Sequence, residues 1–153
     1  MELLFCIAVI VVIASICWPL YLASRPVGPL SGCRSNVKQA SLAILIYSDD
    51  YDDRLPLSSK WGDMVERESR NPAALKDVEG VPDGSFGYAF RKSASGIQSS
   101  SVKAMDTFAM IFDITLMTKN AAGELDSLPS PGRHDGKDVI GYLDGHVHAM
   151  NVP

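Results

Sequence analysis

The chain has 153 residues, with 14 lysine and arginine side chains against 18 aspartate and glutamate side chains and a formal net charge of −4. This mild acidity, without a basic cluster, excludes nucleic acid as an expected partner, because phosphate binding needs clustered lysine and arginine. Three cysteines are too few for a disulfide framework. The length suffices for a membrane segment followed by one soluble domain of about 125 residues.

The first segment, residues 3–23, has the composition of a transmembrane helix. It contains no charged side chain, and as a helix it would span roughly 31 Å, about the hydrocarbon thickness of a bilayer. Trp18 and Tyr21 lie near its C-terminal end, where aromatic rings favour the membrane interface. A cleaved signal is disfavoured, because no lysine or arginine precedes Arg25 and the apolar run is long. We predict that residues 1–24 form a single membrane-spanning helix.

Residues 25–32 are predicted to be a linker, because their prolines and glycines disfavour helix. The sequence Leu-Ser-Gly-Cys at residues 30–33 also matches the lipobox of bacterial lipoproteins, whose cysteine is lipidated. A lipobox follows its apolar run directly, whereas Arg25 and two prolines intervene here. A free thiol at Cys33 is therefore the simpler interpretation, and lipidation is the alternative.

Helical periodicity returns from Arg34 to Tyr51, where apolar and small side chains recur every three or four residues. The predicted buried face consists of Val37, Ala40, Ser41, Ile44, Tyr47, Ser48 and Tyr51. Ser35 or Asn36 is predicted to cap the start of this helix. We expect a sheet to pack on its apolar face.

The predicted helix ends in a group of acidic side chains, Asp49, Asp50, Asp52 and Asp53. These carboxylates repel one another, and negative charge at a helix C-terminus also opposes the helix dipole. A Ca²⁺ ion would relieve the repulsion, although solvation by water is the commoner solution. The four residues are therefore weak metal candidates, and no other cofactor is predicted.

Strands are predicted in the second half of the chain. Residues 86–90 alternate aromatic with small side chains, and residues 107–117 form an apolar run typical of a buried strand. Asp144-Gly145 stands between two apolar-rich runs, residues 139–143 and 146–150. Asp-Gly in such a position is the strongest short-range signal for a β-hairpin.

The remaining stretches complete one soluble domain over residues 33–153. Trp61 is predicted to be a core side chain, with a weak helical pattern after it, and residues 91–102 and 119–131 are predicted to be loops. The predicted fold class is α+β: an N-terminal transmembrane helix, then an amphipathic helix packed on a small, mainly antiparallel sheet.

The opening of the chain resembles the start of a mature type IV pilin or type II secretion pseudopilin. There a glutamate precedes an apolar helix; Glu2 falls on that glutamate and Pro19 on the proline that bends the pilin helix. The leader of such proteins ends in glycine and is followed by F-T-L, and neither stands before Glu2 in this sequence. A start codon placed too late and a lost processing site both remain open.

Two later stretches resemble a bacterial pilin-like family named for prepilin-type processing and an H-x9-D-G motif. Residues 33–56 resemble its C-x-S-N-L-K-Q…Y-x-x-D…P stretch, and His134 followed after nine residues by Asp144-Gly145 reproduces its motif. The resemblance implies a pilin-like fold and assembly through helix packing into a pilus or pseudopilus. Glu2 would then pair with the N-terminal amine of a neighbouring subunit.

The resemblance also implies a location in the bacterial inner membrane, with the soluble domain outside the cytoplasm. Its implied partners are other pilin-like subunits or components of a secretion system. The positive charges after the span, Arg25, Arg34 and Lys38, instead favour a cytoplasmic domain. A basic leader before Glu2 would resolve this conflict, and we follow the resemblance.

His134 and Asp144 have two interpretations. The turn would let the Asp144 carboxylate accept backbone N–H bonds, and His134 could pin its loop to that carboxylate or to a turn carbonyl. The alternative is a metal site, since candidate nitrogen and oxygen ligands cluster here: His134, Asp135, Asp138, Asp144, His146 and His148. No hydrolytic constellation, G-x-S-x-G sequence or phosphate-binding loop completes a catalytic site.

The sequence therefore predicts a non-enzymatic, membrane-anchored, pilin-like structural protein of a type II secretion or type IV pilus-like system. The alternative is a membrane-tethered extracytoplasmic binding domain that does not polymerise, which the prolines and glycines after the span favour. A third hypothesis, from another class, is a small metal-binding or enzymatic domain that uses the loop of His134.

Overall fold

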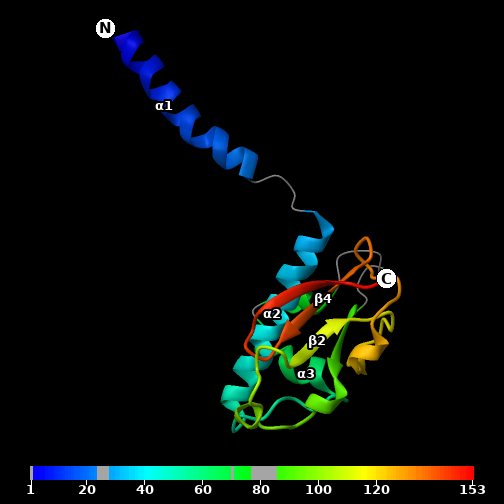
Figure 1. Cartoon of the computed structure of the whole chain (residues 1–153). Helices are drawn as coiled ribbons and strands as arrows, with labels where there is room; N and C mark the ends of the chain where they lie inside the picture. The colour runs from blue at the N-terminus through cyan, green and yellow to red at the C-terminus, as the bar shows by residue number, and fades with distance from the viewer. Residues whose placement is uncertain (1, 24–27, 70, 77–85) are drawn as a thin grey trace.

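The computed structural model describes residues 2–23, 28–69, 71–76 and 86–153 and confirms the predicted α+β fold class (Figure 1). The helices and strands of these ranges are α1 (Glu2–Ala23), α2 (Pro29–Asp50), α3 (Trp61–Val65), β1 (Tyr88–Arg91), β2 (Ala109–Asp113), β3 (Ala122–Gly123), β4 (Lys137–Tyr142) and β5 (Val147–Asn151). Short 3-10 helices lie at η1 (Pro72–Leu75), η2 (Lys92–Ala94), η3 (Ser99–Ser101) and η4 (Leu125–Ser127). The strands form one sheet against which α2 packs.

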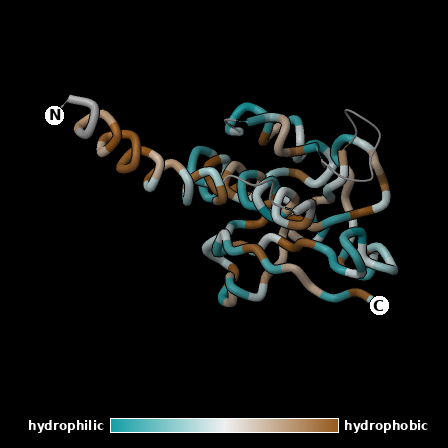
Figure 2. The backbone as a smooth tube through the Cα atoms, turned by 90° about the horizontal axis from the view of Figure 1, so that it is seen from above, coloured by the Kyte–Doolittle hydropathy of each residue, from teal (hydrophilic) through white to brown (hydrophobic). Residues whose placement is uncertain are grey.

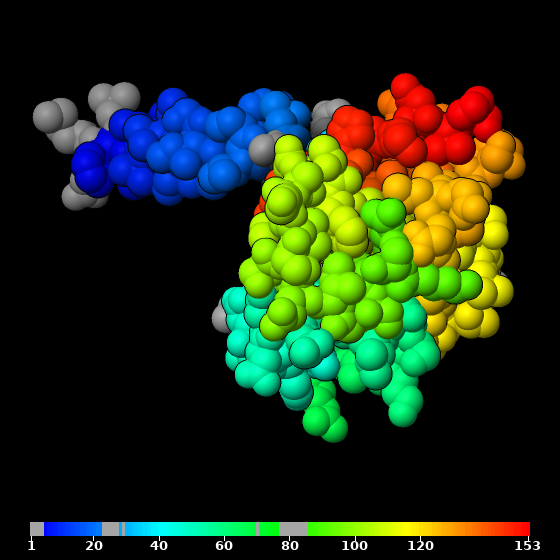
Figure 3. All heavy atoms as spheres, turned by 60° about the horizontal axis from the view of Figure 1, so that its bottom comes forward, coloured from blue at the N-terminus to red at the C-terminus, as the bar shows by residue number. Residues whose placement is uncertain are grey.

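The α1 helix projects from the rest of the chain as a separate apolar rod (Figures 2 and 3). Its segment Phe5–Leu22 has a mean hydropathy of 2.5, and none of it is buried. Pro19 lies inside the helix, where its missing N–H removes one intrahelical hydrogen bond. By length and composition, α1 is consistent with a single membrane span or a signal sequence.

The α2 helix begins at Pro29, earlier than the predicted start at Arg34. Residues 29–32 of the predicted linker are therefore helical, and residues 25–27 lie outside the described part of the chain. Proline is favourable in a first helical turn, because its φ is preset and its missing N–H would have no intrahelical partner there. Pro29 therefore starts a helix in a stretch whose prolines and glycines predicted a linker.

Because the helix starts early, its N-cap is Gly28, and the predicted caps Ser35 and Asn36 lie inside the helix. Its predicted buried face is otherwise confirmed, with side chains from Val37 to Ser48 in the core. Tyr51 is the exception, since it follows the last helical residue and is 47% exposed. It stacks on the ring of Tyr47.

The sheet has the strand order β3-β1-β2-β4-β5, and all neighbours pair antiparallel except β1 with β3. The central strand β2 is buried at every residue, as its apolar sequence predicted. The predicted hairpin is confirmed by β4 and β5, which turn at Asp144-Gly145. Gly145 has a φ of +84°, which glycine adopts without strain. The predicted loop 119–131 contributes the short edge strand β3.

Both faces of the sheet are covered, so successive side chains along one strand enter two different apolar clusters. Tyr88 and Phe90 of β1 face α2, whereas Ala89 between them joins the cluster on the opposite face. That second cluster is closed by Leu125 and Leu128 from the connection after β3. Burial on both faces is the reason for the continuous apolar run of β2.

Trp61 is confirmed as a core side chain. It is 1% exposed, its ring stacks on Phe90, and its Nε1–H donates to the carbonyl oxygen of Ala121 over 2.8 Å. It thereby joins α3 to β1 and to the end of the loop that precedes β3. A buried indole N–H needs such an acceptor, because leaving it unsatisfied is costly.

Gly141 allows α2 to approach the sheet closely. A Cβ at this position would overlap Ser41 Oγ and would lie 2.8 Å from Ile111 Cγ2 and 3.0 Å from Val37 Cγ1. Two of these atoms belong to the helix and the third to β2, so none is the end of a long, adaptable side chain. The spacing between α2 and β4 is therefore set by the absence of a side chain at residue 141.

We predict that Gly141→Ala lowers the free energy of unfolding by about 1–3 kcal/mol, because it overpacks this contact. The measurement is urea unfolding of the full chain in detergent micelles, followed by near-ultraviolet circular dichroism. Gly32→Ala is the matched control, because it lies within α2 and a Cβ there meets nothing within 4 Å. That control is expected to stabilise by about 0.5–1 kcal/mol. Equal midpoints for Gly141→Ala and wild type would contradict the close packing.

Candidate functional site

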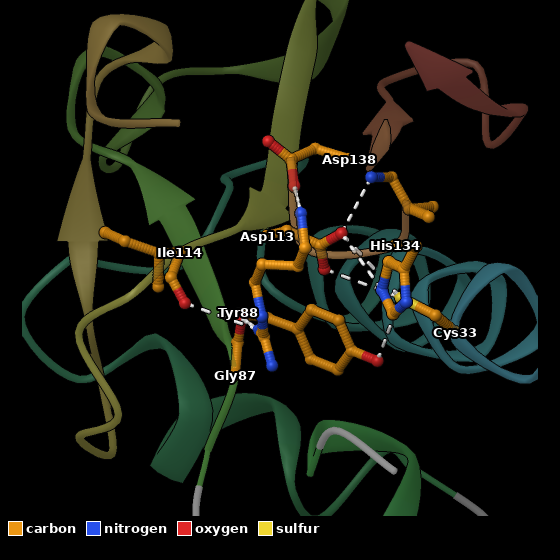
Figure 4. A network of polar contacts seen from close by, with 9 residues as sticks. Cys33, Gly87, Tyr88, Asp113, Ile114, His134 and Asp138 are labelled. Carbon is orange, nitrogen blue, oxygen red and sulfur yellow. Dashed lines mark hydrogen bonds and ion pairs between the residues drawn. The ribbon is translucent and has the colours of Figure 1, made fainter. Parts of the chain in front are cut away.

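A cluster of buried polar side chains joins α2 to the sheet, and we name it the Cys33–Asp113–His134 cluster after its central members (Figure 4). Tyr88 and Asp138 border it. Cys33, Tyr88, Asp113 and Asp138 are at most 1% exposed, and His134 is 6% exposed. Figure 4 shows the side chains of Cys33, Asp113 and His134 pointing toward one another.

Ordinary secondary structure brings these residues together. Cys33 lies one helical turn before Val37 on the buried face of α2. Asp113 is the last residue of β2, and the register of the antiparallel pair places it directly opposite Tyr88 of β1. Each of these positions belongs to a rigid element, so the cluster is preorganised by the fold.

His134 reaches the cluster from a tight turn before β4. Its N–H donates to the carbonyl oxygen of Lys137 over 2.9 Å, and the Lys137 N–H donates back over 3.1 Å. Asp135 and Gly136, between them, have φ values of +52° and +79°. Positive φ at both central residues is the pattern of an Asp-Gly turn. The turn fixes the direction in which the imidazole points.

Asp113 is the centre of the contacts. Its Oδ1 accepts a hydrogen bond from Cys33 Sγ at 3.4 Å, and its Oδ2 accepts one from the Val139 N–H at 2.7 Å. His134 Nε2 lies 3.5 Å from the same Oδ2. The Tyr88 hydroxyl donates to Cys33 Sγ over 3.5 Å. The buried carboxylate therefore contacts α2, β4 and the turn that precedes β4.

A second buried carboxylate, that of Asp138, lies beside the first. Its Oδ1 accepts the N–H of Arg133 at 2.8 Å, while its Oδ2 is buried without a hydrogen-bond donor among the described residues. Burial raises the pKa of Asp138, and the negative charge of Asp113 raises it further. The Arg133 N–H and the charges of His134 and Arg133 offset part of that pKa increase.

Comparison of the chain with protein-family models, with curated proteins and with solved structures finds no match. The pilin resemblance therefore remains a sequence-based expectation.

His134 and Asp144, the two ends of the H-x9-D-G spacing, do not come together. They stand before and after β4, a six-residue strand that spans roughly 20 Å. The interpretation in which His134 pins its loop to Asp144 or to the hairpin turn does not fit this arrangement, because the strand between the two residues is extended. The carboxylate that His134 meets is Asp113, from the neighbouring strand.

Asp144 instead organises its own turn. Its Oδ1 accepts a hydrogen bond from the backbone N–H of His146 at 2.9 Å and lies 2.6 Å from His146 Nδ1. The expectation that the Asp144 carboxylate accepts a backbone N–H is thereby confirmed. The His146 ring stacks on Tyr142, and His148 is exposed on β5. Lys38 Nζ donates to the carbonyl oxygen of Gly145 over 2.6 Å, which ties the turn to α2.

The other predicted metal candidates are not gathered into a site. Within the described ranges, the group of three histidine, cysteine or carboxylate ligands close enough to share a metal is Cys33, Asp113 and His134. Asp49 and Asp50 are exposed at the end of α2. Asp53 accepts hydrogen bonds from the Ser99 hydroxyl and the Ser100 N–H, and bonds from Ser100 and then Ser99 lower its pKa.

Asp52 has a positive φ of +53° and lies in the exposed turn that follows α2. The side chain of Glu2 lies outside the described part of the chain. Its predicted pairing with a neighbouring subunit therefore stays a prediction.

Two members of the cluster escaped sequence reasoning as site residues, although a signal for each was present. Asp113 is a charged residue that ends an apolar strand, and Cys33 continues the buried stripe of α2 one turn toward the N-terminus. What the sequence did not supply is that β2 ends beside the start of α2. That juxtaposition depends on how the helix crosses the sheet.

A cavity of about 430 Å³ lies beside the cluster, and His134, Arg34, Arg133 and Lys137 contribute to its lining. Cys33 and Asp113 do not line it. The thiol is therefore shielded from this cavity, and in the described structure it donates to a carboxylate. Chemically, the cluster supplies sulfur, oxygen and nitrogen ligands for a metal ion more readily than an exposed nucleophile.

We predict that Asp138→Asn gains stability relative to wild type as the pH rises from about 4 toward neutrality. The pKa of Asp138 is raised in the folded state, whereas in the unfolded state it is about 4. As the pH rises above about 4, the unfolded chain therefore loses this proton before the folded chain does, and the free energy of unfolding of wild type falls until the pH passes the raised pKa. The asparagine variant does not titrate there. The measurement is urea unfolding of both chains across this pH range in EDTA.

Asp53→Asn is the control, because hydrogen bonds from Ser100 and then Ser99, which do not titrate, lower the pKa of Asp53. The stabilising contribution of Asp53 is lost only below about pH 4, so the difference between that variant and wild type should stay constant above it. A pH-independent difference between Asp138→Asn and wild type would contradict the burial of a raised-pKa carboxylate.

Proposed function

We propose that the chain is a non-enzymatic, membrane-anchored, pilin-like structural subunit that assembles through α1. The observation that carries this proposal is the complete exposure of the apolar segment Phe5–Leu22. Water cannot cover such a surface without a large free-energy cost. The surface therefore requires lipid, the helices of other copies, or both in succession.

The arrangement of the soluble part supports the same proposal. A long helix, α2, follows the apolar helix and packs on a mostly antiparallel sheet, which is the architecture that the pilin resemblance implies. In this proposal Glu2 sets the register between subunits and α1 provides the packing surface. Other copies of such subunits, or components of a secretion system, are the partners.

The cluster around Asp113 supports a non-enzymatic role. Its thiol is 1% exposed and lies outside the lining of the adjacent cavity. A catalytic cysteine must reach its substrate, and its thiol is activated in a partly exposed electropositive setting. The proposed location is the bacterial inner membrane, with the domain outside the cytoplasm.

The second candidate is a membrane-tethered extracytoplasmic binding domain that does not polymerise. The observation that favours it is the separation of α1 from α2, which begins anew at Pro29 behind Gly28. A continuous helical rod would transmit subunit packing directly into the domain. The two candidates differ in one measurable property, the contact between α1 helices of different copies.

Natural cysteines on α1 provide the test. Cys6 and Cys17 are exposed, whereas Cys33 is buried. Residues eleven apart return to within about 20° of the same helix face, roughly 16 Å apart. We predict that a bismaleimide applied to membranes produces a ladder of multimers, because each subunit can link to two neighbours.

Single and double serine variants are the controls for this crosslinking. Cys17→Ser, which keeps one reactive thiol, should stop at dimers, and Cys6→Ser/Cys17→Ser should remain monomeric. A wild-type chain that remains monomeric at its natural membrane density would favour the tethered-domain candidate over assembly.

We further predict that Glu2→Ala blocks multimer formation without preventing membrane insertion. In an assembled state an unpaired buried charge is costly, so removing the carboxylate would leave the partner amine unsatisfied. Membrane fractionation measures insertion and the crosslinking ladder measures assembly. Glu2→Gln, which is neutral but similar in size, separates the role of charge from that of packing. An unchanged ladder in Glu2→Ala would reject the assembly role of Glu2.

A further inference from the structure

We propose that Cys33, Asp113 and His134 bind a single Zn²⁺ ion that clamps α2 to the sheet. The three side chains come from α2, from the end of β2 and from the turn before β4. Each offers one ligand atom, and these atoms all lie within 4.8 Å of one another. The site belongs to the soluble domain and does not depend on assembly through α1.

The distances between ligand atoms match a tetrahedral site. Bonds of 2.0–2.3 Å from Zn²⁺ to nitrogen, oxygen and sulfur give ligand–ligand edges of about 3.3–3.8 Å. Asp113 Oδ2 lies 3.8 Å from Cys33 Sγ and 3.5 Å from His134 Nε2. Two edges of the tetrahedron are thus already formed. Three protein ligands leave the fourth position to water.

Charge balance favours the ion. Zn²⁺ bound to a thiolate, a carboxylate and a neutral imidazole makes a group of zero net charge. Binding replaces the thiol proton of Cys33, which leaves to solvent, so charge and atoms balance. Without the ion, the buried carboxylate of Asp113 lies beside that of Asp138, and the charges of His134 and Arg133 act on the same site. A bound cation adds positive charge directly at the Asp113 carboxylate, and buried charges are commonly paired or coordinate a metal.

The surrounding hydrogen bonds are those that a metal site needs. The Val139 N–H donates to Asp113 Oδ2, and the Tyr88 hydroxyl donates to Cys33 Sγ. Partners of this kind orient the ligands and stabilise their charged forms. The backbone of His134 is held by the two hydrogen bonds that it exchanges with Lys137 across the Asp135-Gly136 turn.

The chain permits an unambiguous test, because it contains three cysteines and three histidines. The background variant Cys6→Ser/Cys17→Ser/His146→Gln/His148→Gln keeps Cys33 and His134 as the single thiol and the single imidazole. The full chain of this variant is purified in detergent, treated with EDTA and titrated with Co²⁺, then with Zn²⁺. Near-ultraviolet circular dichroism confirms that each chain is folded.

We expect one Co²⁺ per chain, a thiolate-to-Co²⁺ charge-transfer band, and displacement of Co²⁺ by Zn²⁺. Adding Cys33→Ser should remove that band. Loss of a residue that only supports a ligand weakens metal binding by about 10–100-fold, so His134→Gln should weaken it at least about 100-fold. Asp53→Asn, a change remote from the cluster, should leave the titration unchanged.

X-ray absorption of the Zn²⁺-loaded background protein covers the case in which a ligand variant fails to fold. One sulfur and otherwise nitrogen or oxygen ligands would support the site. A folded background protein that retains no metal, or a metal environment without sulfur, would overturn the proposal. Neither result bears on the crosslinking of α1, so the two proposals fail independently.

Discussion

The packing of α2 against the sheet depends on the buried carboxylate of Asp113. A carboxylate with no exposed surface is stable only when donors or cations surround it. Three elements supply those partners: the Cys33 thiol on α2, the Val139 N–H on β4, and the His134 ring from the turn that precedes β4. Satisfying one side chain therefore fixes the relative positions of the long helix, the sheet and the turn.

The apolar packing around this polar centre works in the same direction. Gly141 brings β4 close to α2, and Trp61 connects α3 with β1 and with the connection to β3. Apolar burial supplies most of the driving force but is not directional. The hydrogen bonds to Asp113 are directional, so they select one arrangement among those that bury similar areas.

The two parts of the chain meet different requirements. The described part of the chain after α1 buries an apolar core of its own, whereas α1 exposes its apolar surface along its whole described length. A domain with its own core can be displayed at a surface, while an exposed apolar helix gains free energy when lipid or other helices cover it. This division is the physical basis of the proposed role as an anchored structural subunit.

The sequence by itself determined the elements whose signals are local. Residues 3–23 are continuous in hydrophobicity, the face from Val37 to Ser48 has helical spacing, and Asp144-Gly145 stands between two apolar-rich runs, which predicts a hairpin. The start of α2 at Pro29 was not predicted, because proline disrupts the interior of a helix but is favourable in its first turn.

Only the tertiary structure decided the partner of His134. The spacing to Asp144 suggested proximity, but an extended strand separates residues that are close in sequence, and strand pairing joins residues that are far apart. Asp113 and Cys33 reach His134 through the register of β1, β2 and β4 and the crossing of α2. No local pattern encodes that register, because it depends on long-range packing.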